Sequence, residues 1–167
     1  MPVTYKKIAS VTVGSGGAAS MEFTSIPGTY TDLVLHLTGR YDGSTYPNAL
    51  ISINGSTSNF SSRVLYGDGA AAGSTDAVPR FISYNPGSSQ TASTFGSTTA
   101  YFTNYAGSTN KSYSSDTVQE TNGATAYSGL VAGLWSQTAA ITQITVSPST
   151  GNWVQYSTAV LYGISKS

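Results

Sequence analysis

The chain contains no cysteine, and charged side chains make up only 8% of its 167 residues. The lack of cysteine excludes a disulfide framework and any thiolate metal site. Seven basic and seven acidic residues cancel to a formal net charge of zero. Because this balance gives no attraction for a polyanion, we expect neither nucleic acid nor an anionic membrane as a partner.

Long apolar runs and helical patterns are missing as well. No stretch approaches the length of a membrane span, and the first residues lack the apolar core of a signal peptide. No window sustains the apolar spacing of an amphipathic helix. If the protein acts outside a cell, we therefore expect lysis or particle assembly to bring it there.

Hydroxyl and aromatic side chains take the place of the missing charge. The chain has 27 serines, 23 threonines and 12 tyrosines. A nearly neutral surface has little electrostatic repulsion to keep copies apart, so we expect a homo-oligomer or an assembly into a larger particle. The alternative is a Ser/Thr-rich β domain that stays soluble through its hydroxyl groups.

Short extended runs between turn residues indicate the fold. In residues 32–38, Leu33, Leu35 and Leu37 share one face of a strand and Val34 lies on the other, which predicts a central strand covered on both sides. Residues 140–146 are also expected as a strand, and residues 68–79 as a loop. About nine to ten such strands predict an all-β fold, a single antiparallel two-sheet β-sandwich of jelly-roll type over residues 1–167.

The chemistry-bearing residues form no catalytic motif. His36 is the only histidine, and we expect it on a strand face with a local hydrogen bond. Asp32 is interpreted as an Asx-type turn acceptor. Gly67-Asp68-Gly69 fits a hairpin turn better than a calcium loop, because it lacks a spaced run of Asp and Asn. No nucleophile elbow is present, so the sequence predicts no enzyme, no metal and no cofactor.

Aromatic residues in or beside the expected loops are the candidate contact residues. Tyrosine and tryptophan combine an apolar ring with a polar group, which suits protein interfaces and carbohydrate stacking alike. Trp153 is placed at a hairpin tip. The candidates for interface or glycan contacts are Tyr41, Tyr46, Tyr66, Tyr84, Tyr105 and Trp153.

The segment Ile26–Leu35, with the sequence IPGTYTDLVL, resembles a phrase common in small structural proteins and fibre domains of tailed bacteriophages. Further segments resemble the same family in the same order along nearly the whole chain. The segments that carry the resemblance are Ile8–Ser10, Met21–Pro27, Thr29–Leu35, Asn54-Gly55, Asn59-Phe60, Asn104–Ala106 with Lys111, Leu130–Ile141 and Ala159–Ile164.

The resemblance implies a virion structural protein with a β-sandwich domain and no catalytic residues. The small size favours a capsid decoration (cement) protein, exposed on the particle after assembly in the host cytoplasm. It would bind the major capsid protein or other virion proteins, with a homotrimer favoured by shell symmetry. The alternatives are a tail-fibre or fibre-tip protein that contacts host glycans, and a stand-alone carbohydrate-binding module.

Overall fold

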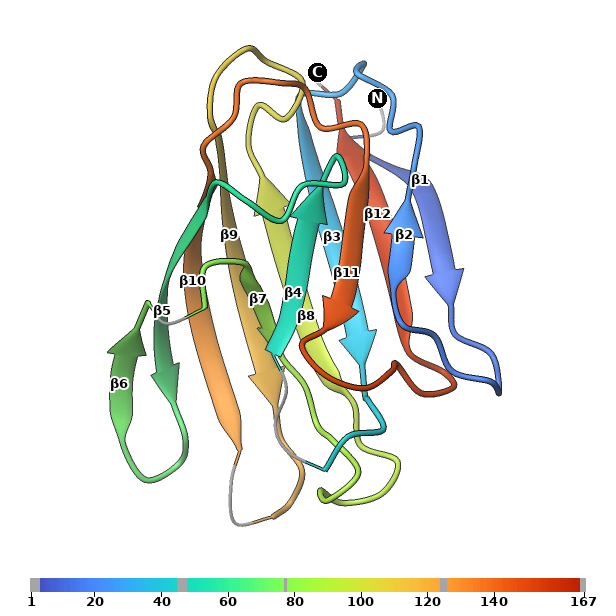
Figure 1. The fold of residues 1–167 in the computed structure, drawn as a ribbon, viewed down its shortest axis with the longest axis vertical. Coiled ribbons are helices and arrows are strands. Elements are labelled where there is room, and N and C mark those ends of the chain that lie inside the picture. The colour runs from blue at the N-terminus through green and yellow to red at the C-terminus, as the bar shows by residue number, and fades with distance from the viewer. Residues whose placement is uncertain (1–3, 45–47, 77, 124–125, 166–167) are drawn as a thin grey trace.

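The computed structural model describes residues 4–44, 48–76, 78–123 and 126–165. These residues form twelve β-strands in two antiparallel sheets (Figure 1). The predicted β-sandwich is confirmed, with more strands than the expected nine to ten. Among the described residues there is no helix of the length and apolarity needed to cross a membrane.

The two sheets differ in size. The larger sheet has eight strands, in the spatial order β1 (Tyr5–Thr12), β12 (Thr158–Ile164), β3 (Asp32–Gly39), β8 (Gly96–Phe102), β9 (Lys111–Gln119), β10 (Tyr127–Trp135), β5 (Phe60–Gly67) and β6 (Ala72–Thr75). The smaller sheet has four strands, in the order β2 (Met21–Phe23), β11 (Ile144–Pro148), β4 (Asn48–Ile53) and β7 (Phe81–Tyr84).

The connections confirm the jelly-roll type. Eight strands give the spatial orders β1-β12-β3-β8 and β2-β11-β4-β7, which is the jelly-roll arrangement. Along the chain these eight strands pass from one sheet to the other at every step except from β4 to β7, which are both in the smaller sheet. The other four strands, β5, β6, β9 and β10, all extend the larger sheet beyond β8. The larger sheet therefore reaches past the edge strand β7 of the smaller one (Figure 1).

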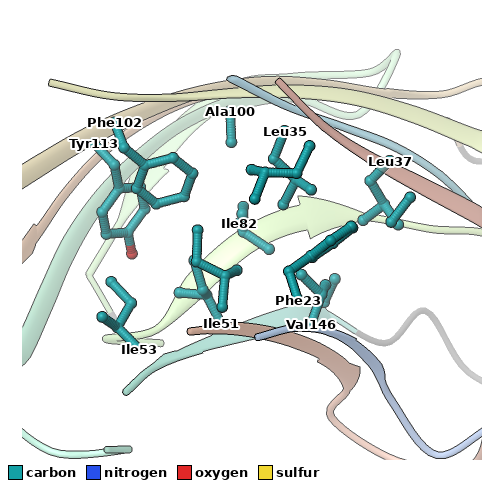
Figure 2. Packing of buried hydrophobic residues seen from close by; sticks show 14 of the residues in the cluster. Phe23, Leu35, Leu37, Ile51, Ile53, Ile82, Ala100, Phe102, Tyr113 and Val146 are labelled. Carbon is teal, nitrogen blue, oxygen red and sulfur yellow. The ribbon is translucent and has the colours of Figure 1, made fainter. Parts of the chain in front are cut away.

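The core lies between the sheets. Leu33, Leu35 and Leu37 of β3 are buried, and Figure 2 shows Leu35 and Leu37 facing side chains of the smaller sheet such as Ile51 and Val146. One hydrophobic cluster joins both sheets. The expectation for the inward face of residues 32–38 is confirmed.

The outward face of β3 differs from the prediction. Val34 is buried, but His36 and Thr38 on the same face are exposed, so no second layer covers this strand. The cross-strand neighbours of Val34 are Tyr101 and Tyr162, and their large side chains account for its burial. The apolar residue on the outward face is therefore explained by its bulky cross-strand neighbours, and it does not mean that a second layer covers the strand.

Two segments were predicted in the wrong conformation. Residues 72–75 form β6 although Ala-Gly-Ser-Thr has little strand propensity, because the preceding turn folds them back on β5. In that turn, Asp68 Oδ1 accepts hydrogen bonds from the backbone N–H groups of Ala70 (2.9 Å) and Ala71 (2.7 Å), which confirms the hairpin interpretation of Gly67-Asp68-Gly69. Residues 140–143 are a loop, held by the side chain of Asn54.

Two buried cations hold loops to the sheets through backbone carbonyl groups. The Lys111 ammonium donates to the carbonyl oxygens of Gly107, Thr109 and Thr138. The Arg40 guanidinium donates to carbonyl oxygens in residues 90–94. Carbonyl dipoles, and no carboxylate within the described part of the chain, therefore compensate the burial of these charges.

Candidate functional site

The aromatic candidates divide into buried and accessible residues, and three of them were predicted wrongly. Tyr41, Tyr105 and Trp153 are completely buried, so they are not available as contact residues. Trp153 packs against Gly39 and its indole N–H donates to the carbonyl oxygen of Val146 at 3.2 Å. These rings lie in loops, as expected, but the loops fold over the open ends of the sandwich and the rings fill the space there.

The other two described candidates, Tyr66 and Tyr84, do come together. Each is half-buried, and Tyr127 joins them. The rings of Tyr84 and Tyr127 are stacked, with centroids 4.9 Å apart and planes 20° apart. The ring of Tyr66 lies 6.4 Å from that of Tyr127. The sixth candidate, Tyr46, lies outside the described residues.

These three rings line a cleft of about 330 Å³, here named the tyrosine cleft. It lies where the extended part of the larger sheet passes the edge of the smaller one. Strands β5, β7 and β9 end there and β4 and β10 begin there, opposite the end at which β1 begins and β12 ends (Figure 1). The remaining lining residues are Asn48, Val64, Asp68, Thr75, Val78 and Phe81.

Two glycines leave the space that the rings of Tyr66 and Tyr84 occupy. A Cβ atom on Gly73 of β6 would lie 2.8 Å from the ring of Tyr66, its cross-strand partner. A Cβ atom on Gly129 of β10 would lie 3.0 Å from the ring of Tyr84. Larger residues at either position would displace the rings, so the cleft is shaped by the absence of side chains on two strands.

The cleft is acidic and contains no cation. Burial raises the pKa of Tyr84 to about 12, and the neighbouring Tyr66 and Tyr127 raise it further in the same direction. Hydrogen bonds from the backbone of Ala71 and Ala70 lower the pKa of Asp68, so this residue carries a negative charge at neutral pH. None of the described residues that line the cleft is lysine or arginine.

A buried amide lies beside the cleft. A second hollow shares Tyr127 with it and is lined by Gln119 and Glu120 of the segment that ends β9. Gln119 is only 1% exposed, and neither its Oε1 nor its Nε2 has a hydrogen-bond partner in the described part of the chain. Unpaired amides of this kind are rare in protein interiors because each unsatisfied group costs free energy.

Sequence reasoning missed Gln119 and Asn48 and did not include Tyr127 among the contact candidates. The inward-facing positions of β9 are Lys111, Tyr113, Ser115, Thr117 and Gln119, most of them polar, and its outward positions are polar as well except for Val118. Alternation therefore could not show which face was buried. Polar residues on both faces of a long strand were the signal that could have led to Gln119.

The residues with catalytic potential lie apart. His36 is on the open face of the larger sheet, where its Nδ1 lies 3.0 Å from Thr99 Oγ1, as predicted. Ser83, Thr98 and Thr117 form a buried hydroxyl cluster between the sheets, with no histidine or carboxylate among its hydrogen-bond partners in the described chain. No group of three metal-ligating side chains occurs among the described residues.

The Asx-turn interpretation of Asp32 is wrong. Its Oδ2 accepts a hydrogen bond from the Tyr101 hydroxyl, and its Oδ1 accepts one from the backbone N–H of Asn104, each at 2.7 Å. The carboxylate therefore links the start of β3 to β8 and the turn after it. A residue close in sequence was the expected partner, but the strand pairing brings distant donors nearer.

A second accessible surface lies on the outer side of the same strands. Leu65 of β5 and Leu130 of β10 are direct cross-strand neighbours and are 61% and 60% exposed. With the exposed Val118 of β9 they form an apolar patch on the open face of the larger sheet, here named the outer patch. Exposed apolar groups in one place favour contact with another protein.

Comparison with models of known protein families found no match, and neither did comparison with curated proteins.

Proposed function

We propose that the chain is a bacteriophage virion structural protein, specifically a capsid decoration protein that binds the head surface and stabilises the shell. The ordered resemblance along the chain supports the proposal, as does the jelly-roll topology, which recurs in viral capsid proteins. Because one fold serves many functions, the contact surface must supply the rest of the support. In this proposal the protein is not an enzyme.

The outer patch is the observation on which the proposal rests. Leu65, Leu130 and Val118 lie on one sheet face, with the exposed Asp116 opposite Leu130. Covering the three apolar side chains would gain the free energy of burying apolar surface. A specific interface buries about 1,600 Å² in total. A decoration protein attached in this way would stabilise the shell, since separating the capsid subunits would also break the new contacts.

The copy number in purified virions tests this proposal. A decoration protein is expected in a number comparable to that of the major capsid protein, in head fractions and not in tail fractions. Symmetry favours attachment as a trimer. A copy number equal to that of the tail fibres, or recovery with tails alone, would contradict the head assignment.

Two substitutions test the outer patch itself. Leu65→Glu and Leu130→Glu should leave the fold intact, because both side chains are exposed, but should reduce rebinding to shells that lack the protein. Ser112→Glu, at an exposed position of β9 on the same face, is the matched control. Equal rebinding of all three variants would show that another surface is used.

The tyrosine cleft favours a second candidate, a tail-fibre or fibre-tip protein that contacts host glycans. The same fractionation separates the two candidates, because a fibre-tip protein is expected in tail fractions at low copy number. A stand-alone carbohydrate-binding module would be found in neither fraction.

A further inference from the structure

We propose that the tyrosine cleft, together with Gln119, is a binding site for a neutral saccharide. The inference concerns the isolated chain and does not depend on where the protein sits in a particle. Three features support it: the ring geometry, the charge of the lining and the unpaired amide.

The rings of the cleft suit a sugar ring, apart from the faces that Tyr84 and Tyr127 stack against each other. One side of a pyranose carries mainly C–H groups, and these pack against the electron-rich face of an aromatic ring while the hydroxyls remain free to hydrogen-bond. The cleft volume of about 330 Å³ lies at the lower end of the range for small-ligand sites. Because Gly73 and Gly129 fix the places of Tyr66 and Tyr84, little ordering is needed when a ligand arrives.

The charge of the lining selects a neutral ligand. Asp68 and Glu120 are the charged residues among the described linings of the two hollows, and no cation accompanies them. A phosphate, a sulfate or an acidic sugar would be repelled. Carboxylate oxygens accept hydrogen bonds from hydroxyl groups, which a neutral saccharide supplies in numbers.

Gln119 points to a ligand with adjacent donors and acceptors. Its amide offers an acceptor oxygen and two N–H donors, all without partners in the described chain. Neighbouring sugar hydroxyls both donate and accept, so they match this pair directly or through a bridging water. Gln119 lines the second hollow beside Tyr127, its cross-strand neighbour.

Nuclear magnetic resonance titration of the purified chain tests the site. The probes are the methyl glycosides of glucose, galactose and mannose, N-acetylglucosamine, and glucuronic and N-acetylneuraminic acids as anionic counterparts. At least one neutral probe should bind with a dissociation constant in the millimolar range or below, and more tightly than its anionic counterpart. Failure of every neutral probe, or preference for an acidic one, would overturn the proposal.

Variants locate the binding. Tyr66→Ser and Gln119→Leu should each weaken the affinity by about tenfold or more. Gly73→Ala should weaken it as well, because it displaces the Tyr66 ring without removing it. Tyr156→Ser, at an exposed tyrosine outside the cleft, is the matched control and should bind like the unchanged protein. Unchanged affinity in the cleft variants would overturn the assignment. It would also be overturned if a proline-rich peptide shifted the resonances of the cleft residues and no saccharide did.

The Gln119→Leu variant also separates a ligand role from a structural one. If the Gln119 amide is unpaired because it binds the saccharide, replacing it by an apolar side chain of similar size should lower the affinity for the saccharide. The melting temperature should stay unchanged or rise. A lower melting temperature with unchanged affinity would show that Gln119 only supports the fold, and would overturn its part in the site.

Discussion

At the scale of single residues, several positions are determined by what a neighbour requires. Gly133 of β10 faces the core opposite Tyr113 of β9, and a Cβ atom there would lie 2.0 Å from the Tyr113 ring. The Tyr113 hydroxyl donates to the carbonyl oxygen of Phe81 at 3.2 Å, which ties the two sheets together. The ring therefore has no alternative place that keeps this bond.

Gly133→Ala should lower the free energy of unfolding by about 2–3 kcal/mol, the usual cost of overpacking a dense core. Urea denaturation measures the change. Gly14→Ala is the control, because a Cβ atom at Gly14 meets nothing within 4 Å. A loss of stability in both variants, or in neither, would contradict this account of the Tyr113 contact.

Tyr101 makes the free energy of unfolding depend on pH in the alkaline range. Its hydrogen bond to Asp32, followed by burial, raises the pKa of Tyr101 to about 12. An unfolded tyrosine ionises near pH 10. Between these values the folded state binds more protons than the unfolded state, so stability present below about pH 10 is lost as the pH rises to about 12.

Tyr101→Phe should therefore flatten the fall of the unfolding free energy across that alkaline range, as measured by urea denaturation at a series of pH values. The variant should also be less stable at neutral pH by about 1 kcal/mol, because the hydrogen bond is lost. Tyr156→Phe, at an exposed position, should keep the slope of the unchanged protein. An identical slope in Tyr101→Phe would show that this residue is not its source.

At the scale of elements, the alternation of residues along a strand predicted the buried face well where one face was apolar. It predicted strands poorly where the residues were small or polar. It placed Leu33, Leu35 and Leu37 correctly, because only one face of β3 meets the other sheet. It could not find β6, whose small residues pair only because the turn at Asp68 returns the chain. Pairing is decided by tertiary context in such strands.

Leu35→Asp should prevent folding, since it would bury an unpaired carboxylate in the centre of the core. His36→Asp, one residue further and on the open face, should fold with a cooperative thermal transition. Circular dichroism melting curves compare the two variants. Soluble, cooperatively folded Leu35→Asp protein would mean that β3 is not the central strand.

The candidate site was predictable from the sequence only in part, because it is formed by the tertiary structure. Loop aromatics were a fair signal, but sequence cannot tell a ring that covers the end of a sandwich, such as Trp153, from one that lines a cleft, such as Tyr84. The cleft joins strands far apart in the chain, from Asn48 to Tyr127. The shape of the cleft depends on where β7 ends relative to the part of the larger sheet that extends beyond β8. No local sequence pattern specifies that position.

At the scale of the whole molecule, the described structure depends little on ion pairs. The salt bridge between Arg63 and Asp76 is long, at 3.5 Å, and both side chains are largely exposed. Such pairs contribute little to stability. The buried cations Lys111 and Arg40 are held by carbonyl groups, which keep their dipoles in salt solution.

The urea midpoint should therefore change little between low salt and about 1 M sodium chloride, where interactions between exposed charges are screened. Lys111→Met should lower stability at every salt concentration, by about 1–3 kcal/mol, because it leaves partly buried carbonyl groups without a donor. Arg63→Met should have no comparable effect. A midpoint that falls steadily with salt would point to charge pairs that this picture omits.

Strand β5 has an open outer side, and its two sides carry different chemistry at consecutive positions. Leu65 points outward into the outer patch, and Tyr66 points inward into the tyrosine cleft. Consecutive side chains of a strand point in opposite directions. A copy that rests on a support through the outer patch therefore turns its cleft toward the medium, so attachment alone fixes the orientation of the site.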